Sequence, residues 1–410
     1  MPSTGSAQVA YALGVVSRLW PEPATVLATT RRSAAGGERV AAEWLLLPNP
    51  SRPTLLVPVG LPQASRMLQR HGDKIVPRAV RASMAWGVRT GQLAHLPVAR
   101  IRVLAPQPSP APGQRSAQGS AQGYLNEAVP GVQALGLILG TPRPNRKPVL
   151  QLFTADGATL GFVKVGVDGF TKRLVQTEAA NLTVVHEAGL KTIEAPQVLH
   201  CGVFDDLELL ALSPMHSSQE RRDTSIPFPA MAELSRIKGV TSEPLASSAF
   251  VRSLTLAVDD LGAFPGASDL GLLLTRVLDR WGDGDVEFGS WHGDWAPWNM
   301  GHGNGRVQLW DWERFSCDIP LGFDAIHFRA QRVRHGQGDT AQSERRLVTD
   351  VPTLLTRAGA GDAALEPVRH LCLYLLEISS RFLRMSSTAS EQTVPPRARW
   401  ALDFAARLLQ

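Results

Sequence analysis

The stretch Val286-Glu-Phe-Gly-Ser-Trp-His-Gly-Asp-Trp-Ala-Pro-Trp-Asn-Met300, followed beyond a glycine-rich turn by Val307-Gln-Leu-Trp-Asp-Trp-Glu-Arg-Phe315, carries the polar residues that indicate the fold. Asn299 lies five residues after Asp294. The glycines of the turn permit a short hairpin, and its second, apolar strand ends at Asp311. We therefore expect Asp294, Asn299 and Asp311 to lie close together in space.

These three residue types suit the transfer of a phosphoryl group from ATP. That reaction needs a carboxylate to accept the proton of the attacking hydroxyl, and oxygen ligands to hold magnesium on the phosphates. Asp294 fits the first role, while Asn299 and Asp311 fit the second. The alternative is a turn-rich loop with one satisfied histidine and a few surface acids. Three polar residues in a fixed order favour the kinase interpretation.

The order His292-Gly-Asp294, four residues, Asn299, then an apolar run and Asp311-Trp-Glu, resembles the aminoglycoside phosphotransferase and choline kinase superfamily, relatives of the protein kinases. The resemblance covers roughly residues 130–385. It implies a two-lobed fold, ATP and Mg²⁺ as cofactors, Asp294 as the catalytic base, and His292 as a brace for the loop. It also implies that Asp324 caps the next helix and supports this loop. A zinc site at His292 and His302 lacks a ligand pattern.

A second constellation pairs a lysine with a glutamate upstream. Glu178 lies in the middle of an apolar helical stripe formed by Leu174, Leu182 and Val185. An inward carboxylate is costly unless it is paired. Lys164 is the one charged residue among the apolar residues of a preceding strand, and it could be an exposed edge residue. A pair between Lys164 and Glu178 would explain both the lysine in the apolar strand and the glutamate on the apolar stripe. In a kinase this pair would hold the lysine on the nucleotide phosphates.

The nucleotide contacts are less well specified. No Walker-type phosphate loop occurs, and the segment 140–147 between two expected strands lacks the Gly-x-Gly-x-x-Gly pattern. Its polar side chains are candidate phosphate ligands: Thr141, Asn145, Arg146 and Lys147. The resemblance places the hinge between lobes at residues 213–215, where backbone groups of Ser213 and Met215 would bind the adenine edge. Glu313 is interpreted as a salt-bridge anchor rather than a second metal ligand.

The composition of the chain narrows the classes of protein to which it can belong. The 410 residues suggest two or three domains, and 44% hydrophobic with 19% charged residues is typical of a globular chain. The net charge of +5 is spread along the sequence without a Lys/Arg block, so we expect no nucleic-acid partner. Three scattered cysteines, no secretory signal and no membrane-spanning stretch indicate a cytoplasmic protein. The sequence leaves the oligomeric state open.

The expected fold class is α+β: a small α/β N-terminal domain precedes a protein-kinase-like fold. Residues 1–105 form the accessory domain, with strands at 42–47 and 54–59 and a helix at 63–70. Residues 106–122, rich in Pro, Ser, Gly and Gln, form a linker. Residues 123–215 form an antiparallel small lobe with strands at 134–139, 148–153, 160–167, 198–203 and 207–212 and a helix at 172–188. Residues 216–410 form a helical large lobe, with helices at 231–238, 246–259, 270–280, 323–333, 342–356, 363–385 and 396–409.

The expected function is that of an ATP- and magnesium-dependent kinase acting on a hydroxyl of a sugar or sugar-like natural product. Residues 322–410 carry 12 Arg and no Lys against 9 acids, which disfavours a polycationic acceptor. An aminoglycoside ranks second, and a choline-like amine in an aromatic cage third. Most of the six tryptophans between residues 281 and 312 are expected in the core. A nucleotide-binding regulatory module without turnover is the alternative, and a protein kinase is disfavoured because no activation segment follows Asp311.

Overall fold

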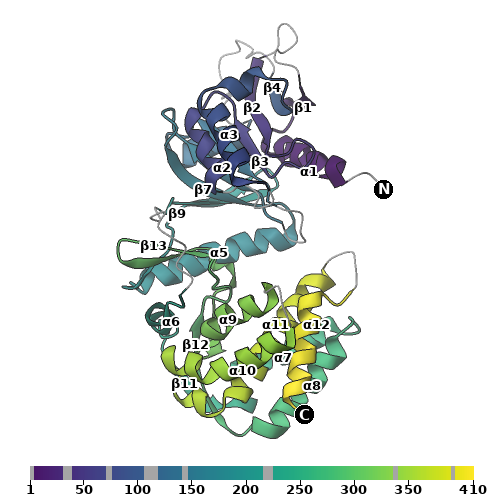
Figure 1. The fold of residues 1–410 in the computed structure, drawn as a ribbon, viewed down its shortest axis with the longest axis vertical. Helices are drawn as coiled ribbons and strands as arrows, with labels where there is room; N and C mark the ends of the chain where they lie inside the picture. The colour runs from purple at the N-terminus through teal and green to yellow at the C-terminus, as the bar shows by residue number, and fades with distance from the viewer. Residues whose placement is uncertain are drawn as a thin grey trace. The chain divides into compact units, whose positions relative to one another are not determined.

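The computed structural model describes residues 4–30, 39–70, 76–105, 119–140, 146–215, 225–335, 340–388 and 393–410. The chain divides into two compact units. The first unit comprises Met1–Ala179 and Pro196–Met215, and the second comprises Ala180–Ala195 and His216–Gln410. Figure 1 shows the strands of the first unit in purple to teal and most helices of the second in green to yellow.

One antiparallel sheet of nine strands organises the first unit. The strands follow the order β1 (Thr25–Thr29), β4 (Arg100–Ala105), β2 (Arg39–Leu47), β3 (Leu55–Pro58), β5 (Ala134–Ile138), β6 (Val149–Phe153), β7 (Thr159–Gly166), β10 (Leu207–Leu212) and β9 (Val198–Phe204). The strands predicted at 134–139, 148–153, 160–167, 198–203 and 207–212 are thereby confirmed as β5, β6, β7, β9 and β10.

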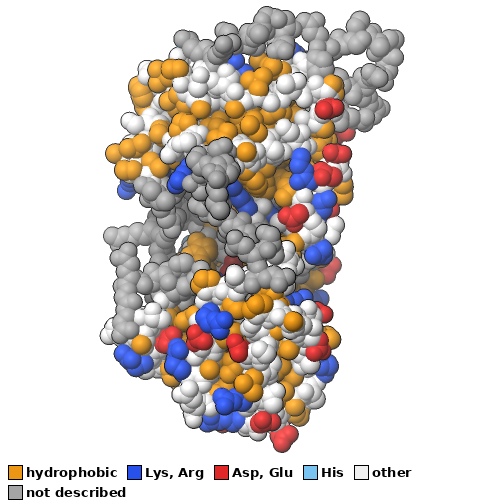
Figure 2. Space-filling model, turned by 90° about the vertical axis from the view of Figure 1, so that its right-hand side faces the viewer, with side chains coloured by type: hydrophobic (Ala, Val, Ile, Leu, Met, Phe, Trp, Pro, Cys, Tyr) orange, Lys and Arg blue, Asp and Glu red, His pale blue; other side chains and the backbone are white. Residues whose placement is uncertain are grey.

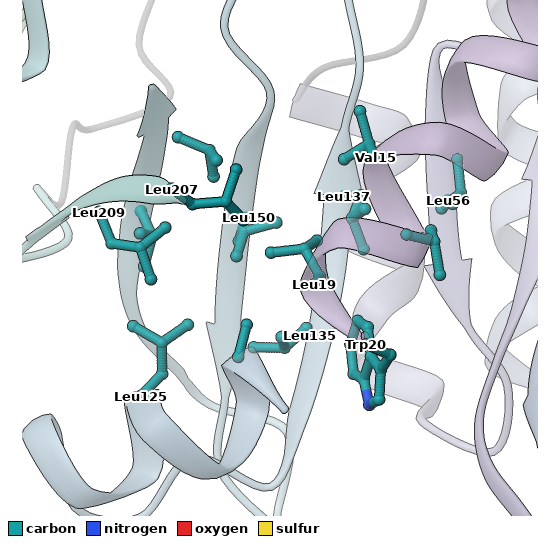
Figure 3. Close-up of a cluster of buried hydrophobic side chains, with 14 of the residues drawn as sticks. Val15, Leu19, Trp20, Leu56, Leu125, Leu135, Leu137, Leu150, Leu207 and Leu209 are labelled. Carbon is teal, nitrogen blue, oxygen red and sulfur yellow. The ribbon is translucent and has the colours of Figure 1, made fainter. Parts of the chain in front are cut away.

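Helices cover both faces of this sheet because successive side chains of a strand point to opposite faces. Trp44 and Leu46 belong to a hydrophobic core with helices α1 (Thr4–Leu19) and α4 (Ala121–Ala128), while Leu45 and Leu47 belong to a core with α2 (Arg66–Arg70) and α3 (Arg78–Arg89). The short 3₁₀ turns η1 (Pro62–Ser65) and η2 (Gln92–His95) flank α2 and α3 in the sequence. In Figure 3 the end of α1 lies against Leu135 and Leu137 of β5.

The prediction of a separate N-terminal domain over residues 1–105 is corrected by this sheet. Leu55 and Leu56 of β3 pair with Ile138 and Leu137 of β5. The indole N–H of Trp44 donates to the carbonyl oxygen of Leu135 at 2.5 Å. The physical reason is that two apolar strands complete each other's hydrogen bonds and bury one shared core, instead of leaving two open sheet edges. Most of the predicted linker, residues 106–118, lies outside the described residues; α4 begins at Ala121.

The second unit is mainly helical and holds two small sheets. One sheet has the order β11 (Thr241–Pro244), β12 (Asp285–Trp291), β15 (Ser316–Pro320), and the other β13 (Met300–Gly303), β14 (Arg306–Leu309), β8 (Ile193–Glu194). Its helices and 3₁₀ turns are α6 (Phe228–Leu234), η3 (Leu245–Ser247), α7 (Ala249–Leu261), α8 (Ala267–Trp281), η4 (Trp312–Arg314), α9 (Phe323–His335), α10 (Thr340–Arg357), η5 (Asp362–Leu365), α11 (Pro367–Ser387) and α12 (Pro396–Leu408). They confirm the predicted helices within a few residues at each end.

The core of the second unit is built around Phe323 at the start of α9. Its ring contacts the rings of Trp291, Phe250 and Tyr374, with centroids 5.6, 5.9 and 5.7 Å away in edge-on geometry. Edge-on aromatic pairs of this kind are favourable beyond the area they bury. This cluster joins the end of β12 to α7, α9 and α11, so it fixes the strand from which the loop around Asp294 emerges.

The surface mixes charge signs. On the face shown in Figure 2, Lys and Arg side chains are interspersed with Asp and Glu side chains and with exposed hydrophobic ones. Among the described residues, no helix combines the length and apolar character needed to cross a bilayer.

Candidate active site

His292 holds the start of the loop that follows β12. It is fully buried, its Nδ1 accepts a hydrogen bond from the backbone N–H of Asp294 at 3.2 Å, and its Nε2 lies 3.1 Å from the carbonyl oxygen of Trp310. Because Nδ1 accepts, the proton must sit on Nε2 and point at that carbonyl. Burial lowers the pKa of His292 to about 4, so the ring is neutral. His292 therefore braces the loop, because both of its ring nitrogens lie at hydrogen-bond distance from backbone groups.

Asp324 supports the same loop from the first turn of α9. Its carboxylate accepts the backbone N–H of His292 at 2.8 Å and that of Gly293 at 3.2 Å. Gly293 has a left-handed φ of +80°, and a Cβ there would collide with the carbonyl oxygen of Arg314. The tight turn therefore requires glycine. The expected support of the loop by Asp324 is confirmed.

Asp294 presents a carboxylate with both oxygens engaged. Oδ2 accepts a hydrogen bond from Nδ2 of Asn299 at 2.9 Å, and Oδ1 lies 3.3 Å from Nε2 of His327. The side chain stays 38% exposed, so it remains open to a substrate. Burial pushes its pKa up, but the hydrogen bond and charge of His327, with His292 and Arg381, outweigh burial and hold the pKa well below its usual range. The carboxylate is ionised at neutral pH.

The hairpin of β13 and β14 places Asp311 near Asn299. Met300 pairs with Leu309, and the N–H of Trp310 donates to the carbonyl oxygen of Asn299 at 3.1 Å. Asp311 then follows with a left-handed φ of +67°, a strained conformation that clusters at functional sites. Asn181 of α5 (Gly169–Glu187) holds the 3₁₀ turn η4 that follows Asp311. Its amide donates to the carbonyl oxygens of Trp312 and Phe315 at 2.8 and 3.2 Å.

Asn299 and Asp311 fit a magnesium ion by the chemistry of their donors. Both hydrogen bonds that the Asn299 side chain makes use Nδ2, which leaves Oδ1 to act as a ligand. Amide and carboxylate oxygens are the hard ligands that Mg²⁺ prefers, and such sites need few protein ligands because phosphate oxygens and water complete the shell. In the described ranges, no group of three or more His, Cys, Asp and Glu residues could hold a metal.

The Lys164–Glu178 pair forms as the sequence predicted. Nζ of Lys164 lies 2.7 Å from both carboxylate oxygens of Glu178. Lys164 sits in the interior of the sheet, opposite Val149 of β6 and Leu210 of β10, and Glu178 is fully buried. The buried positions of α5 run through Val175 and Glu178, in step with the helical repeat. Two buried charges are tolerable here because each satisfies the other.

The remaining predicted nucleotide ligands divide into three groups. Thr141 and Asn145 lie outside the described residues. The guanidinium of Arg146 makes contacts within the protein. It donates to Gln8 Oε1 and to the carbonyl oxygen of Gly140, each at 2.9 Å, and stacks 4.0 Å from the centre of the Tyr11 ring.

At the predicted hinge, the N–H of Ser213 already donates to the carbonyl oxygen of Gln197 at 2.9 Å, and its hydroxyl accepts the N–H of Gln197. Residue 214 is a proline without an N–H. Within 213–215, neither Ser213 nor Pro214 therefore offers a spare backbone N–H.

Three residues near Asp294 were not predicted. His327 lies on α9, one turn after Asp324; Tyr374 of α11 lies with its hydroxyl 3.0 Å from Nδ1 of His327. Arg381 of α11 donates to the carbonyl oxygen of Gly293 at 2.5 Å and stacks on Trp291. The available signal was His327 itself, a histidine between Ile326 and Phe328, one helical turn after Asp324.

Positive charge collects beside the loop. Burial, together with the nearby Arg381, lowers the pKa of Arg314 to about 10, and Arg314 donates to the sulfur of Met385 at 3.2 Å. Glu313, the expected anchor, lies at the limit of ion-pair distance from Arg314, 4.0 Å. Of the six tryptophans in this region, Trp291, Trp295 and Trp312 are fully buried, whereas Trp298 is 44% exposed.

A scan against protein-family models finds no match, and a search among curated proteins finds none either. Among solved structures, the chain is similar to aminoglycoside phosphotransferase APH(4)-Ia bound to ADP and hygromycin B, with 15% identity, a TM-score of 0.45, and coverage of 70% of this chain and 97% of that one. It is similar to choline kinase LicA from Streptococcus pneumoniae, with 15% identity, a TM-score of 0.43, and coverage of 70% and 96%. It is also similar to amicoumacin kinase hAmiN in complex with AMP-PNP, Ca²⁺ and Ami, with 10% identity, a TM-score of 0.41, and coverage of 72% and 94%. All three are small-molecule kinases, the class that the motif around Asp294 resembles.

Proposed function

We propose that the protein is an ATP- and magnesium-dependent kinase that phosphorylates a hydroxyl group of a small molecule. The observation that carries the proposal is the contact between Asp294 and Asn299 at the base of the hairpin that ends at Asp311. A base, an amide oxygen and a second carboxylate in this order are the protein groups that phosphoryl transfer uses. The buried Lys164–Glu178 pair supplies, independently, the cation expected on the nucleotide phosphates.

In the proposed reaction, the acceptor hydroxyl gives its proton to Asp294 and its oxygen bonds to the γ-phosphorus of ATP. The bond from that phosphorus to the β,γ-bridging oxygen breaks, and its electron pair leaves with ADP. Magnesium, when bound, neutralises charge on the phosphate oxygens. Because the pKa of Asp294 is held low, the carboxylate is a weak base in the ground state. Its main contribution is to orient the hydroxyl, and the proton moves late, once transfer makes the hydroxyl acidic.

The acceptor is proposed to be neutral or anionic, with a sugar-like polyol as the first choice. Arg381 contributes positive charge next to Asp294, and Arg314 lies near both. Fixed guanidinium groups repel a polycation, so an aminoglycoside ranks second. A choline-like amine ranks third: in this region the fully buried Trp291, Trp295 and Trp312 belong to the core, which leaves few rings for an aromatic cage.

A regulatory module that binds nucleotide without turnover is the second candidate. It would keep the Lys164–Glu178 pair but needs no ordered base. The two hydrogen bonds to the Asp294 carboxylate favour catalysis over nucleotide binding alone, because they orient a carboxylate that stays 38% exposed and could meet an acceptor hydroxyl.

The deciding experiment measures ADP formation with MgATP against sugars, sugar alcohols, aminoglycosides, amino alcohols and a peptide array. We expect at least one small hydroxyl acceptor to raise the rate tenfold or more, with a phosphomonoester product seen by ³¹P NMR. Neutral or anionic polyols should outperform aminoglycosides. Thermal stabilisation by MgATP without transfer to any acceptor in single-turnover assays would instead identify the regulatory module, and transfer to peptides would identify a protein kinase.

A further inference from the structure

A chain of buried polar groups runs behind the carboxylate of Asp294. Nε2 of His327 lies 3.3 Å from Oδ1 of Asp294, and Nδ1 of His327 lies 3.0 Å from the hydroxyl of Tyr374. His327 is 1% exposed, Gln331 2% and Tyr374 fully buried. All of these residues belong to the second unit.

The direction of these hydrogen bonds follows from the donors available. The ionised carboxylate of Asp294 only accepts, so Nε2 of His327 carries the proton that faces it, and Nδ1 is left to accept from the O–H of Tyr374. A neutral imidazole whose Nδ1 accepts carries its proton on Nε2. That N–H faces Oδ1 of Asp294. The opposite tautomer would aim a nitrogen lone pair at the ionised carboxylate.

Gln331 agrees with this direction. Its amide lies 2.7 Å from Nε2 of His327, and its Oε1 is buried without a hydrogen-bond partner when Nε2 of the amide faces the ring. The two ends of a glutamine amide have the same shape, so exchanging them places Oε1 against the imidazole N–H. With the ends exchanged, the Nε2–H of His327 has two acceptors, Asp294 and Gln331, and the amide nitrogen of Gln331 takes the position where the oxygen had no partner.

We propose that His327 is a positioning residue for the catalytic carboxylate, with its tautomer fixed by Tyr374. Asn299 holds Oδ2 and His327 holds Oδ1, so the torsion of the Asp294 side chain is set from both sides. An oriented carboxylate keeps a defined lone pair toward the acceptor hydroxyl. The rate of transfer depends on this alignment, and small misplacements of the carboxylate lower it strongly. This inference rests on the proposed function and adds to it a residue that the motif around Asp294 does not include.

The test uses the full-length protein and steady-state kinetics with the best acceptor. We expect His327→Leu to lower kcat roughly 10–100-fold, the usual effect of losing a group that orients a catalytic side chain, and to leave KM for MgATP within about twofold. His327→Gln retains an N–H donor and should recover a substantial part of that loss. Tyr374→Phe keeps the ring and its packing, so it should fold, and should lower kcat about 3–10-fold by releasing the tautomer.

His370 is the matched control. It is a buried histidine on α11, 1% exposed, whose Nδ1 lies 3.4 Å from the carbonyl oxygen of Glu366. His370→Gln should leave kcat unchanged. A merely structural His327 would lower the unfolding temperature and nucleotide affinity together with kcat, and the glutamine variant would bring no recovery; that result overturns the inference.

A second measurement does not depend on turnover. In protein labelled with ¹⁵N-histidine, long-range ¹H–¹⁵N correlation should show His327 with its proton on Nε2, and Asp294→Ala should shift that signal. A proton on Nδ1 would overturn the inference even if no acceptor has been found. If Asp294→Ala abolishes turnover while the His327 and Tyr374 variants match wild type, the inference alone fails. If Asp294→Ala stays active, the proposed catalytic base fails.

Discussion

Asp311 and Asp318 are two aspartates with a left-handed backbone conformation, and they differ in their place in the structure. Their φ angles are +67° and +59°. Asp311 ends the hairpin beside Asn299, whereas Asp318 is exposed on β15. Left-handed non-glycine residues cost energy that the surrounding structure must supply. The proposed magnesium site gives a reason for the strain at Asp311, and we assign no such role to Asp318.

This difference yields a prediction at the residue scale. Asp311→Asn removes a charge from the proposed magnesium site and should abolish magnesium-dependent ATP binding, a loss of at least about 100-fold, while ATP binding without magnesium changes little. Asp318→Asn, the control at similar backbone geometry, should bind MgATP like wild type. Isothermal titration with and without magnesium measures both. Unchanged MgATP affinity in Asp311→Asn would remove that residue from the metal site.

Asp324 gives a pH-dependent prediction. Burial raises its pKa to about 7, against the opposing backbone N–H groups of His292 and Gly293. A raised pKa in the folded state means that the stabilising contribution is fully present below the unfolded-state pKa near 4 and is lost as pH rises to about 7. Asp324→Asn lacks this titration. The excess stability of wild type over Asp324→Asn should therefore be largest near pH 4 and shrink up to about pH 7.

The measurement is the midpoint of thermal unfolding of both proteins between pH 4 and 8. A unit of this size shifts by roughly 2–4 °C for each kcal/mol, so a change of this kind is measurable. A difference between the two proteins that stays constant with pH, or grows as pH rises, would show that Asp324 is ionised throughout.

At the scale of elements, the sequence predicted what local pattern controls. The hairpin from Met300 to Leu309 followed from its glycines and apolar run, and the Lys164–Glu178 pair followed from the helical stripe around Glu178. Both rest on short-range periodicity. The pairing of β3 with β5 joins residues more than 80 positions apart in the sequence, and no local pattern specifies which neighbouring strand an edge strand pairs with. The sheet was therefore missed, although two of its N-terminal strands were found.

The residues of the candidate site likewise divide into those that a local sequence pattern predicted and those that it did not. Asp294, Asn299 and Asp311 were predictable because one hairpin carries them. His327 and Tyr374 reach Asp294 from α9 and α11, 33 and 80 residues further along the chain. Their placement depends on how the helices pack around Phe323. A side chain's contacts across helices follow from tertiary packing, which a local pattern does not contain.

The strand–helix pair β7–α5 provides the element-scale prediction. Lys164→Met or Glu178→Leu alone leaves one buried group without its partner and should destabilise the first unit by about 3–5 kcal/mol, while the double replacement Lys164→Met/Glu178→Leu should cost much less than the sum. The double variant should still fail to bind ATP tightly, because it lacks the cation for the phosphates. Thermal unfolding and ATP titration measure the two effects separately.

Glu43 supplies the control, since it pairs with Arg100 at 2.9 Å and Arg102 at 3.0 Å in the same sheet and has no proposed role. Glu43→Gln should lower stability without changing ATP affinity. Wild-type ATP affinity in the double variant would contradict the assignment of Lys164 to the nucleotide.

At the scale of the whole molecule, residues 1–105 are part of the core of the first unit. A fragment beginning at Gly119 would expose the partners of Trp44, Leu56, Ile101 and Val103, all buried in one cluster with residues of β5, β6, β7, β9 and β10. Each buried apolar side chain contributes about 1.5–3 kcal/mol, and a folded protein has only about 5–15 kcal/mol in total. We expect fragment 119–410 to be insoluble or unfolded, as judged by size-exclusion chromatography and circular dichroism.

The control keeps every residue. A protease site inserted in the segment 106–118 and cut after folding should leave two pieces that stay associated, because the shared sheet still holds them. A soluble 119–410 fragment with cooperative unfolding would contradict the shared core and restore the idea of a separate N-terminal domain.

The central claim, that Asp294 is the base of a phosphoryl transfer, is tested most directly by Asp294→Ala. The account predicts a loss of at least about 100-fold in acceptor-dependent kcat, with MgATP affinity within about threefold of wild type. Asp285→Ala, at an exposed acid on β12, should keep full activity. An Asp294→Ala protein that transfers phosphoryl groups at the wild-type rate would contradict the account.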